Sequence, residues 1–112
     1  MQSYGGLRFR IAGEVHEGSV LVFPKRTLAW AVAEAAQVTV ETLEPVTAAD
    51  ERPAILVVGC GPTFQAPPAG LRSGLKAAGV ALEWMDTGAA CRTFNVLLAE
   101  ERDCAAALIA VE

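Results

Sequence analysis

Residues 54 to 62 read Ala-Ile-Leu-Val-Val-Gly-Cys-Gly-Pro, an unbroken apolar run that meets a Gly-x-Gly-Pro turn. Such a run is typical of a strand that is buried on both faces, as in a parallel sheet. Open sheets of this kind bind ligands beyond the carboxyl ends of their strands, where helix N-termini present backbone N–H groups. The pattern therefore predicts a binding site at Gly59, Cys60 and Gly61 and leaves its chemistry undefined.

Length and composition indicate one α/β domain over residues 1–112, because a chain of this length buries roughly two-thirds of its unfolded surface. The hydrophobic fraction of 53% includes only 6% aromatic residues, which indicates a core rich in Ala and Val. No apolar run approaches the ~18 residues of a membrane span, and the first residues lack the pattern of a signal peptide. We therefore expect a cytoplasmic protein with no membrane span.

Charge and cysteine content narrow the classes of partner and cofactor. The formal net charge is −4 and the nine Lys and Arg residues are scattered singly, which argues against a nucleic-acid partner. The three cysteines share no short spacing, which favours reduced thiols over a disulfide framework or a zinc site. The single histidine, His16, is expected in a solvated loop, because metal sites and acid–base catalysis need several converging groups. The sequence thus predicts no cofactor and no metal site.

The first half of the chain predicts an N-terminal antiparallel β-meander. Strict alternation in Leu-Arg-Phe-Arg-Ile, residues 7 to 11, places one apolar face inward and two arginines in solvent. Pro45 limits the following helical pattern to a short, imperfect helix. The further predicted elements of this half are strands at residues 20–23 and 27–32 and a helix within residues 40–49.

The second half predicts a strand–helix–strand unit, so that the central sheet is mixed and contains a βαβ crossover. The helix that starts near Pro68 is expected to end at Gly79 in a left-handed cap. Gly70 and Gly74 each cost this helix about 1 kcal/mol relative to Ala, and either close packing or plain local weakness explains them. The remaining predicted elements are a strand at residues 80–85, a helix capped by Asp86 or Thr87 with its apolar arc from Ala90 to Leu98, and a strand at residues 104–111.

The Gly59-Cys60-Gly61 turn does not match a dinucleotide-binding fingerprint. The third glycine of that motif would stand at Phe64, and Pro62 interrupts the turn. A thiol at a strand end could serve as a nucleophile, but no histidine lies near Cys60 in the sequence to activate it. We expect Cys60 to be more accessible to a thiol reagent than Cys91 or Cys104, which lie in apolar runs.

Three stretches carry a resemblance to a known family: residues 55–61, residues 85–97 and residues 101–109. They resemble a family of unknown function that includes the third assembly factor of mitochondrial NADH dehydrogenase (complex I) and the adipogenesis-associated Mth-domain protein. The most specific part is the Thr-x-x-Ala-x-x-Thr-aromatic-Asn pattern, Thr87 to Asn95, and the chain looks like a short bacterial member. The resemblance implies a compact α/β domain with a central mixed sheet and no established catalytic activity.

The candidate binding site consists of Gly59, Cys60 and Gly61 together with Arg92, Thr93 and Asn95. Arg92 supplies a cation at this strand end, and the Asn95 amide either ties the helix to the Gly59–Gly61 loop or contacts a bound molecule. The leading functional interpretation is a non-enzymatic binding or assembly module that acts through a protein partner. The alternative is small-molecule binding, with an anionic ligand in view of Arg92, or an unrecognised enzymatic activity in the same pocket. The sequence does not define the oligomeric state.

Overall fold

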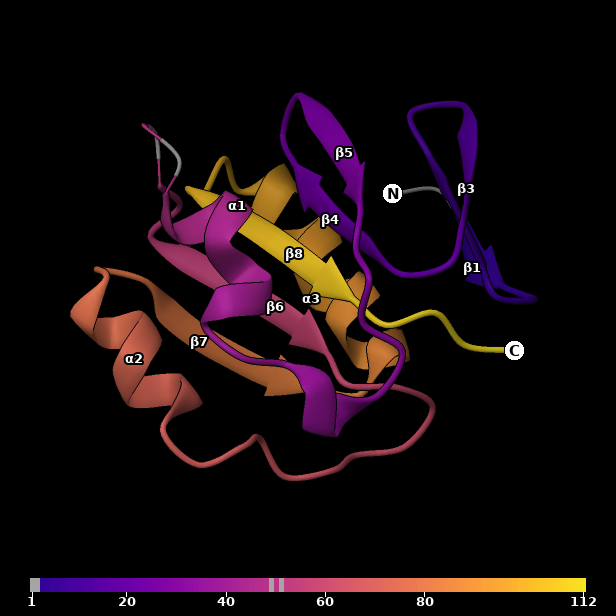
Figure 1. Cartoon of the computed structure of the whole chain (residues 1–112). Coiled ribbons are helices and arrows are strands. Elements are labelled where there is room, and N and C mark those ends of the chain that lie inside the picture. Colours follow the sequence, from indigo (N-terminus) through magenta and orange to yellow (C-terminus); the bar gives the residue numbers. More distant parts are fainter. Residues whose placement is uncertain (1–2, 49, 51) are drawn as a thin grey trace.

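Two β-sheets organise the computed structural model, which describes residues 3–48, 50 and 52–112 (Figure 1). The smaller sheet is antiparallel, with the strand order β1-β2-β3, and the larger has the order β5-β4-β8-β6-β7. In the larger sheet β6 pairs in parallel with β7 and β8, whereas β4 pairs antiparallel with β5 and β8. The strands are β1 Ser3–Gly5, β2 Arg8–Ile11, β3 Glu14–Glu17, β4 Val20–Phe23, β5 Arg26–Ala29, β6 Ile55–Gly59, β7 Ala81–Met85 and β8 Cys104–Leu108. The predicted α/β domain with a mixed central sheet and an N-terminal meander is confirmed.

The alanine-rich strand β8 forms the centre of the larger sheet, and every residue in it is buried. Ala106 lies opposite Val57 of β6 on one side and opposite Val22 of β4 on the other. The prediction of a strand here is confirmed. Pairing on both sides overrides the helix preference of alanine, because the sheet satisfies the backbone groups of β8 and its small side chains suit a doubly covered strand.

Helical segments cover both faces of the larger sheet (Figure 1). On one face, Leu71 and Leu75 of α2 pack with Leu43 and Val46 from the short helical segments in one core cluster. On the other face, Phe94 of α3 packs with residues of β2, β4 and β8. The helices are α1 Glu44–Thr47, α2 Leu71–Ala77 and α3 Thr87–Ala99, and the 3-10 turns are η1 Ala35–Gln37 and η2 Glu41–Leu43. The layer order is therefore helix, sheet, helix, with the small sheet beside α3.

Several predicted boundaries differ from the structure. His16 lies in β3 opposite Phe9, and not in a loop, because the polar passage folds back as the third strand of the small sheet. The strand predicted at residues 27–32 is β5, which ends at Ala29. Trp30 is nevertheless buried, and its ring N–H donates to the carbonyl of Thr42 (2.9 Å). The imperfect helix predicted for residues 40–49 is divided into η2 and α1, and Ala49 lies outside the described residues.

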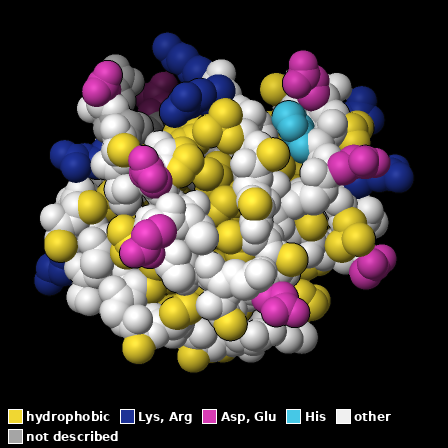
Figure 2. Space-filling model, viewed as in Figure 1, with side chains coloured by type: hydrophobic (Ala, Val, Ile, Leu, Met, Phe, Trp, Pro, Cys, Tyr) yellow, Lys and Arg dark blue, Asp and Glu magenta, His cyan; other side chains and the backbone are white. Residues whose placement is uncertain are grey.

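The face over β4, β5 and α1 carries an apolar patch framed by charged side chains (Figure 2). Phe23 and Leu28 are only partly buried there and pack against the core. The guanidinium of Arg26 lies 4.6 Å from the centre of the Phe23 ring, a cation–π contact that covers part of this patch. Part of the apolar surface of the β4–β5 hairpin therefore stays exposed beside the Arg26 side chain.

The helix α2 begins at Leu71, three residues later than the start predicted near Pro68. Gly70 precedes the helix with a positive φ of 83°, so it does not lie on the helix with Gly74 as predicted. Gly79 has the predicted left-handed conformation, and Val80 N–H returns to the carbonyl of Leu75 (2.9 Å). A Cβ on Gly74 would lie 2.7 Å from Cγ2 of Val40, so close packing explains this glycine.

Replacing Gly74 with Ala tests that packing. We expect Gly74→Ala to lower the free energy of unfolding by about 1 kcal/mol or more, because the overlap with Val40 outweighs the gain in helix propensity. In a Val40→Ala background the same change should be neutral or stabilising by up to about 1 kcal/mol. Urea denaturation of the four proteins measures this, and an equal effect in both backgrounds would contradict it.

Candidate functional site

Thr87 joins the ends of two neighbouring strands to the first turn of α3. Its hydroxyl donates to the carbonyl of Ile109 (2.8 Å) and accepts the N–H of Gly61 (3.1 Å). Its own N–H donates to the carbonyl of Gly61 (2.9 Å), and its side chain is completely buried. Asp86 caps the helix, with its carboxylate accepting the N–H of Ala89 (2.9 Å). The ends of β6 and β8 are therefore fixed to the start of α3.

Two glycines of the strand-end turn are required by this arrangement, for different reasons. A Cβ on Gly59 would lie 2.8 Å from the Cα of Thr87 and 3.2 Å from the Cβ of Ala90, so no side chain fits between β6 and α3. Gly61 has open space around it, but its φ of +121° is a conformation that other residues rarely adopt. The Gly-x-Gly pattern is thus explained by the path of the backbone.

Cys60 is buried, with 1% of its surface exposed, which contradicts the expectation of an accessible thiol. Its Sγ accepts the N–H of Gln65 (3.4 Å) and donates to the carbonyl of Thr63 (3.6 Å). The chain after Gly61 folds back over the thiol through residues three and five positions further on, and Cys60 also belongs to the core cluster on the α2 face of the sheet, a long-range placement that no local pattern predicts. Cys91 and Cys104 are buried as well, so exposure does not distinguish the three cysteines.

A cavity of about 330 Å³ opens beside this turn, at the strand end where the sequence predicts a site. The turn contributes Cys60, Gly61 and Gln65, and Glu34 of the segment before η1 supplies a carboxylate. The complete lining is Ala33, Glu34, Ala35, Ala36, Cys60, Gly61, Pro62, Gln65, Ile109 and Ala110. The cavity offers one acidic and one amide side chain and has room for a small molecule.

The three predicted site residues of α3 lie outside this cavity. The Thr93 hydroxyl donates to the sulfur of Met85 (3.3 Å), which ties the helix to the end of β7. Arg92 and Asn95 are exposed on the outer side of α3. The structure therefore separates the six predicted residues: Cys60 and Gly61 line the cavity, Gly59 packs against α3 at the end of β6, and the other three lie on the helix.

Thr87 is the residue that sequence reasoning missed at this site. The sequence predicts Thr87 only as an alternative to Asp86 for the helix cap and as the first position of the Thr-to-Asn pattern, whereas in the structure Asp86 makes the cap. The signal available in the sequence is a hydroxyl residue directly after the capping aspartate. Its two hydrogen-bond partners, Gly61 and Ile109, come from other parts of the chain and could not be identified locally.

A family described as "Protein of unknown function (DUF498/DUF598)" matches residues 1–109 of the chain. The chain belongs to this family. One relative of this DUF498/DUF598 member, NADH dehydrogenase [ubiquinone] 1 alpha subcomplex assembly factor 3 of Xenopus tropicalis, is 36% identical over 97% of the chain. An uncharacterised protein of Rhodobacter capsulatus is 35% identical over 97% of the chain and 82% of its own length. The chain spans about 60% of the length of the first of these curated relatives.

Solved structures of bacterial proteins share the fold of this DUF498/DUF598 member. A structure described as an outer membrane protein from Bartonella henselae is 34% identical, with a TM-score of 0.88 over 100% of this chain and 94% of that one. A protein of Rhodopseudomonas palustris is 37% identical, with a TM-score of 0.84 over 98% of this chain and 82% of that one. Within the described part of the chain, no helix has the length and apolarity needed to cross a bilayer. The same residues contain no cluster of three or more His, Cys, Asp or Glu side chains arranged to hold a metal ion.

Removing the Thr87 hydroxyl tests its bridging role. We expect Thr87→Val to lower the free energy of unfolding by about 2–4 kcal/mol, because it leaves the N–H of Gly61 and the carbonyl of Ile109 buried without that partner. Thr87→Ser is the matched control, since it keeps the hydroxyl and should cost only about 1 kcal/mol for the lost methyl group. If urea denaturation gave the same loss of unfolding free energy for Thr87→Val and Thr87→Ser, the hydroxyl would not be what holds α3 to the ends of β6 and β8.

The Cys91 thiol provides a pH test of the packing under α3. Burial raises the pKa of Cys91 from an ordinary value of 9.0 to about 11. Between pH 9 and 11 the unfolded thiol ionises while the folded one keeps its proton, so the free energy of unfolding falls as the pH rises, by up to about 2 kcal/mol. Cys91→Ala should show a smaller decline over this range in urea titrations at each pH. If Cys91→Ala and the wild type showed the same pH dependence, the decline could not be assigned to the buried Cys91 thiol.

Proposed function

We propose that this DUF498/DUF598 member is a non-enzymatic binding module that acts through a protein partner, with the outer side of α3 as its contact surface. The observation that carries the proposal is the exposed face of this helix. Val96 is 56% exposed in the interior of α3, and Arg92 and Asn95 are exposed beside it. Residues three or four positions apart share one face of a helix, so these side chains form one small surface.

The chemistry of this surface suits an acidic region of another protein. Arg92 provides a planar cation that can bind a carboxylate through two N–H groups, and Asn95 provides a directional amide. Val96 contributes apolar area that association removes from water. A charged hydrogen bond of this type contributes about 1.5–3 kcal/mol, which is enough for one residue to dominate a small interface.

The names of the relatives support a role in assembly. The Xenopus tropicalis relative carries the name of an assembly factor, and the shared region includes nearly all of this chain. By extension we propose that the present chain also contacts another protein. Its partner is defined here only by the acidic surface that Arg92 would bind.

The strand-end turn supports a structural and not a chemical role for its polar groups. The Cys60 thiol is engaged with the backbone at Thr63 and Gln65, and the Thr87 hydroxyl is engaged with Gly61 and Ile109. A nucleophile needs a base or a depressed pKa, and the hydrogen-bond partners of both groups are backbone atoms. These contacts favour a module without a catalytic step.

The cavity beside the turn favours a second candidate function. Its volume of about 330 Å³ and the convergence of Glu34 and Gln65 would suit a small polar ligand. A ligand that binds the folded state stabilises it by RT ln(1 + [L]/Kd) and so raises the melting temperature as its concentration rises, whereas a protein-contact surface does not respond to metabolites. A thermal-shift screen of metabolites therefore distinguishes the two functions.

Charge reversal at Arg92 tests the protein-partner proposal. The immobilised chain should recover a defined partner from a lysate of Rhodobacter capsulatus, a bacterium that contains a protein 35% identical to this chain. The Arg92→Glu variant should recover at least tenfold less of that partner. The melting temperature should stay within about 1 °C, because the side chain is exposed. Arg102→Glu, a matched change at another exposed arginine, should recover the partner as well as the wild type. Equal recovery by all three baits would place the contact elsewhere.

A further inference from the structure

The strand β7 is an open edge of the larger sheet. Among the described residues it pairs with β6 on one side and with no strand on the other. The N–H of Ala81 donates to the carbonyl of Ala54 (2.9 Å), on the β6 side. Because parallel pairing uses alternate residues, the backbone groups of Leu82 and Trp84 point away from β6. The outward donors and acceptors of this edge therefore belong to two residues that are only 4% (Leu82) and 8% (Trp84) exposed, so an added strand must first displace what covers them.

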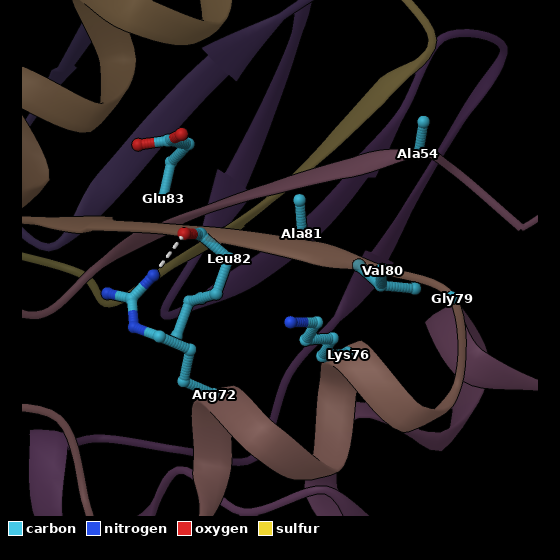
Figure 3. A pocket seen from close by; sticks show the side chains of 8 residues that line it. All are labelled: Ala54, Arg72, Lys76, Gly79, Val80, Ala81, Leu82 and Glu83. Atoms are coloured by element: carbon cyan, nitrogen blue, oxygen red, sulfur yellow. Dashed lines mark hydrogen bonds between the residues drawn. The ribbon is translucent and has the colours of Figure 1, made fainter.

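Arg72 of α2 occupies part of that edge. Its Nη1 donates to the outward carbonyl of Leu82 at 2.7 Å (Figure 3). Lys76 lies one turn further along α2 and also projects toward β7, whereas Glu83 projects to the other side of the strand (Figure 3). A side chain on a flexible stem can leave the carbonyl when a better partner arrives, so the arginine is a removable cap.

A cavity of about 510 Å³ lies between α2 and β7, and it is lined by both cations and by one carboxylate, that of Glu83. Gly79 and Ala81 also line it, and their small size keeps the approach to the edge open. The strand offers five residues, about 16 Å of edge at 3.3 Å per residue. The cavity follows β7 from Ala81 to Glu83, so it has room for the first residues of a short extended segment, which would continue along Trp84 and Met85.

We propose that the β7 edge binds an extended acidic segment of a partner protein as an added strand, with Arg72 and Lys76 pairing with its carboxylates. Main-chain hydrogen bonds to Leu82 and Trp84 would supply the affinity, and the two cations would supply the selectivity. This inference rests on the proposed function only in that the partner is a protein, since it uses a surface other than that of Arg92.

Charge complementarity favours this occupant over a second copy of the chain. Two β7 edges paired about a two-fold axis would bring Arg72 and Lys76 of both copies together on the α2 side of the seam, four cations against the two Glu83 carboxylates, which project to the other side of the strand. Like charges across a strand pair are destabilising, whereas an acidic segment neutralises them. A small anion would use the cations but leave the outward backbone groups of Leu82 and Trp84 without a partner.

Binding of a defined peptide tests the proposal directly. The probe is an acetylated and amidated octapeptide of four Val-Glu repeats, titrated into the ¹⁵N-labelled full chain. The amides of Leu82 and Trp84 should shift and exchange more slowly with solvent, while that of Val96 on α3 should not respond. A Val-Lys octapeptide, matched in length and strand propensity, should bind at least tenfold more weakly.

Variants and competitors give the outcomes that would overturn it. Arg72→Glu combined with Lys76→Glu should weaken the affinity for the Val-Glu octapeptide at least tenfold. Arg102→Glu should leave that affinity unchanged. Equal binding by these variants, shifts confined to other elements, or the same shifts with glutarate alone would refute strand addition. Concentration-dependent self-association through Leu82 without peptide would assign the edge to a second copy instead. The peptide readout does not depend on Arg92, so its failure and failure of the lysate experiment are distinguishable.

Discussion

The backbone of Thr87 lies so near the end of β6 that a Cβ on Gly59 would come within 2.8 Å of it. This contact brings α3 onto the sheet at a point where β6 and β8 also end. The Thr87 hydroxyl then satisfies one backbone group from each of the two loops, at Gly61 and Ile109. Because buried backbone groups without partners are costly, the glycine and the hydroxyl depend on each other. The orientation of α3, and hence the face it presents to solvent, follows from this junction.

The same closeness explains the composition of β8. Ala105 and Ala107 belong to the core cluster on one face of the sheet, and Ala106 belongs to the cluster on the other. Small side chains on both faces let the helical layers approach the central strand. On one face the fully buried Phe94 of α3 belongs to the same cluster as Ala106, and on the other Trp84 of β7 belongs to the cluster that contains Ala105 and Ala107, so bulky residues from neighbouring elements accompany the small ones of β8. An alanine-rich strand and a few bulky residues are thus two parts of one packing solution.

Local patterns predicted the elements whose signals are contained in a few residues. The run before Gly59, the cap at Asp86 and the left-handed Gly79 are of this kind, since each depends on its own backbone or on near neighbours. The burial of Cys60 and the bridging role of Thr87 escaped prediction, because both depend on contacts that the fold creates. Of the six predicted site residues, Cys60 and Gly61 line the cavity at the end of β6, whereas the helix residues lie on a different surface. Sequence distance gave no indication of that division.

The two proposed contact surfaces meet around the end of β7. Arg72 lies on α2, over one face of the sheet, and Arg92 lies on α3, over the opposite face. Met85, the last residue of β7, accepts a hydrogen bond from Thr93, the neighbour of Arg92. A segment added along β7 would therefore emerge beside the outer side of α3. Since the chain carries a net charge of −4, its attraction for an acidic partner must be local, acting over distances shorter than the ~8 Å screening length of physiological salt. Two cations at the edge and one on the helix provide that local attraction.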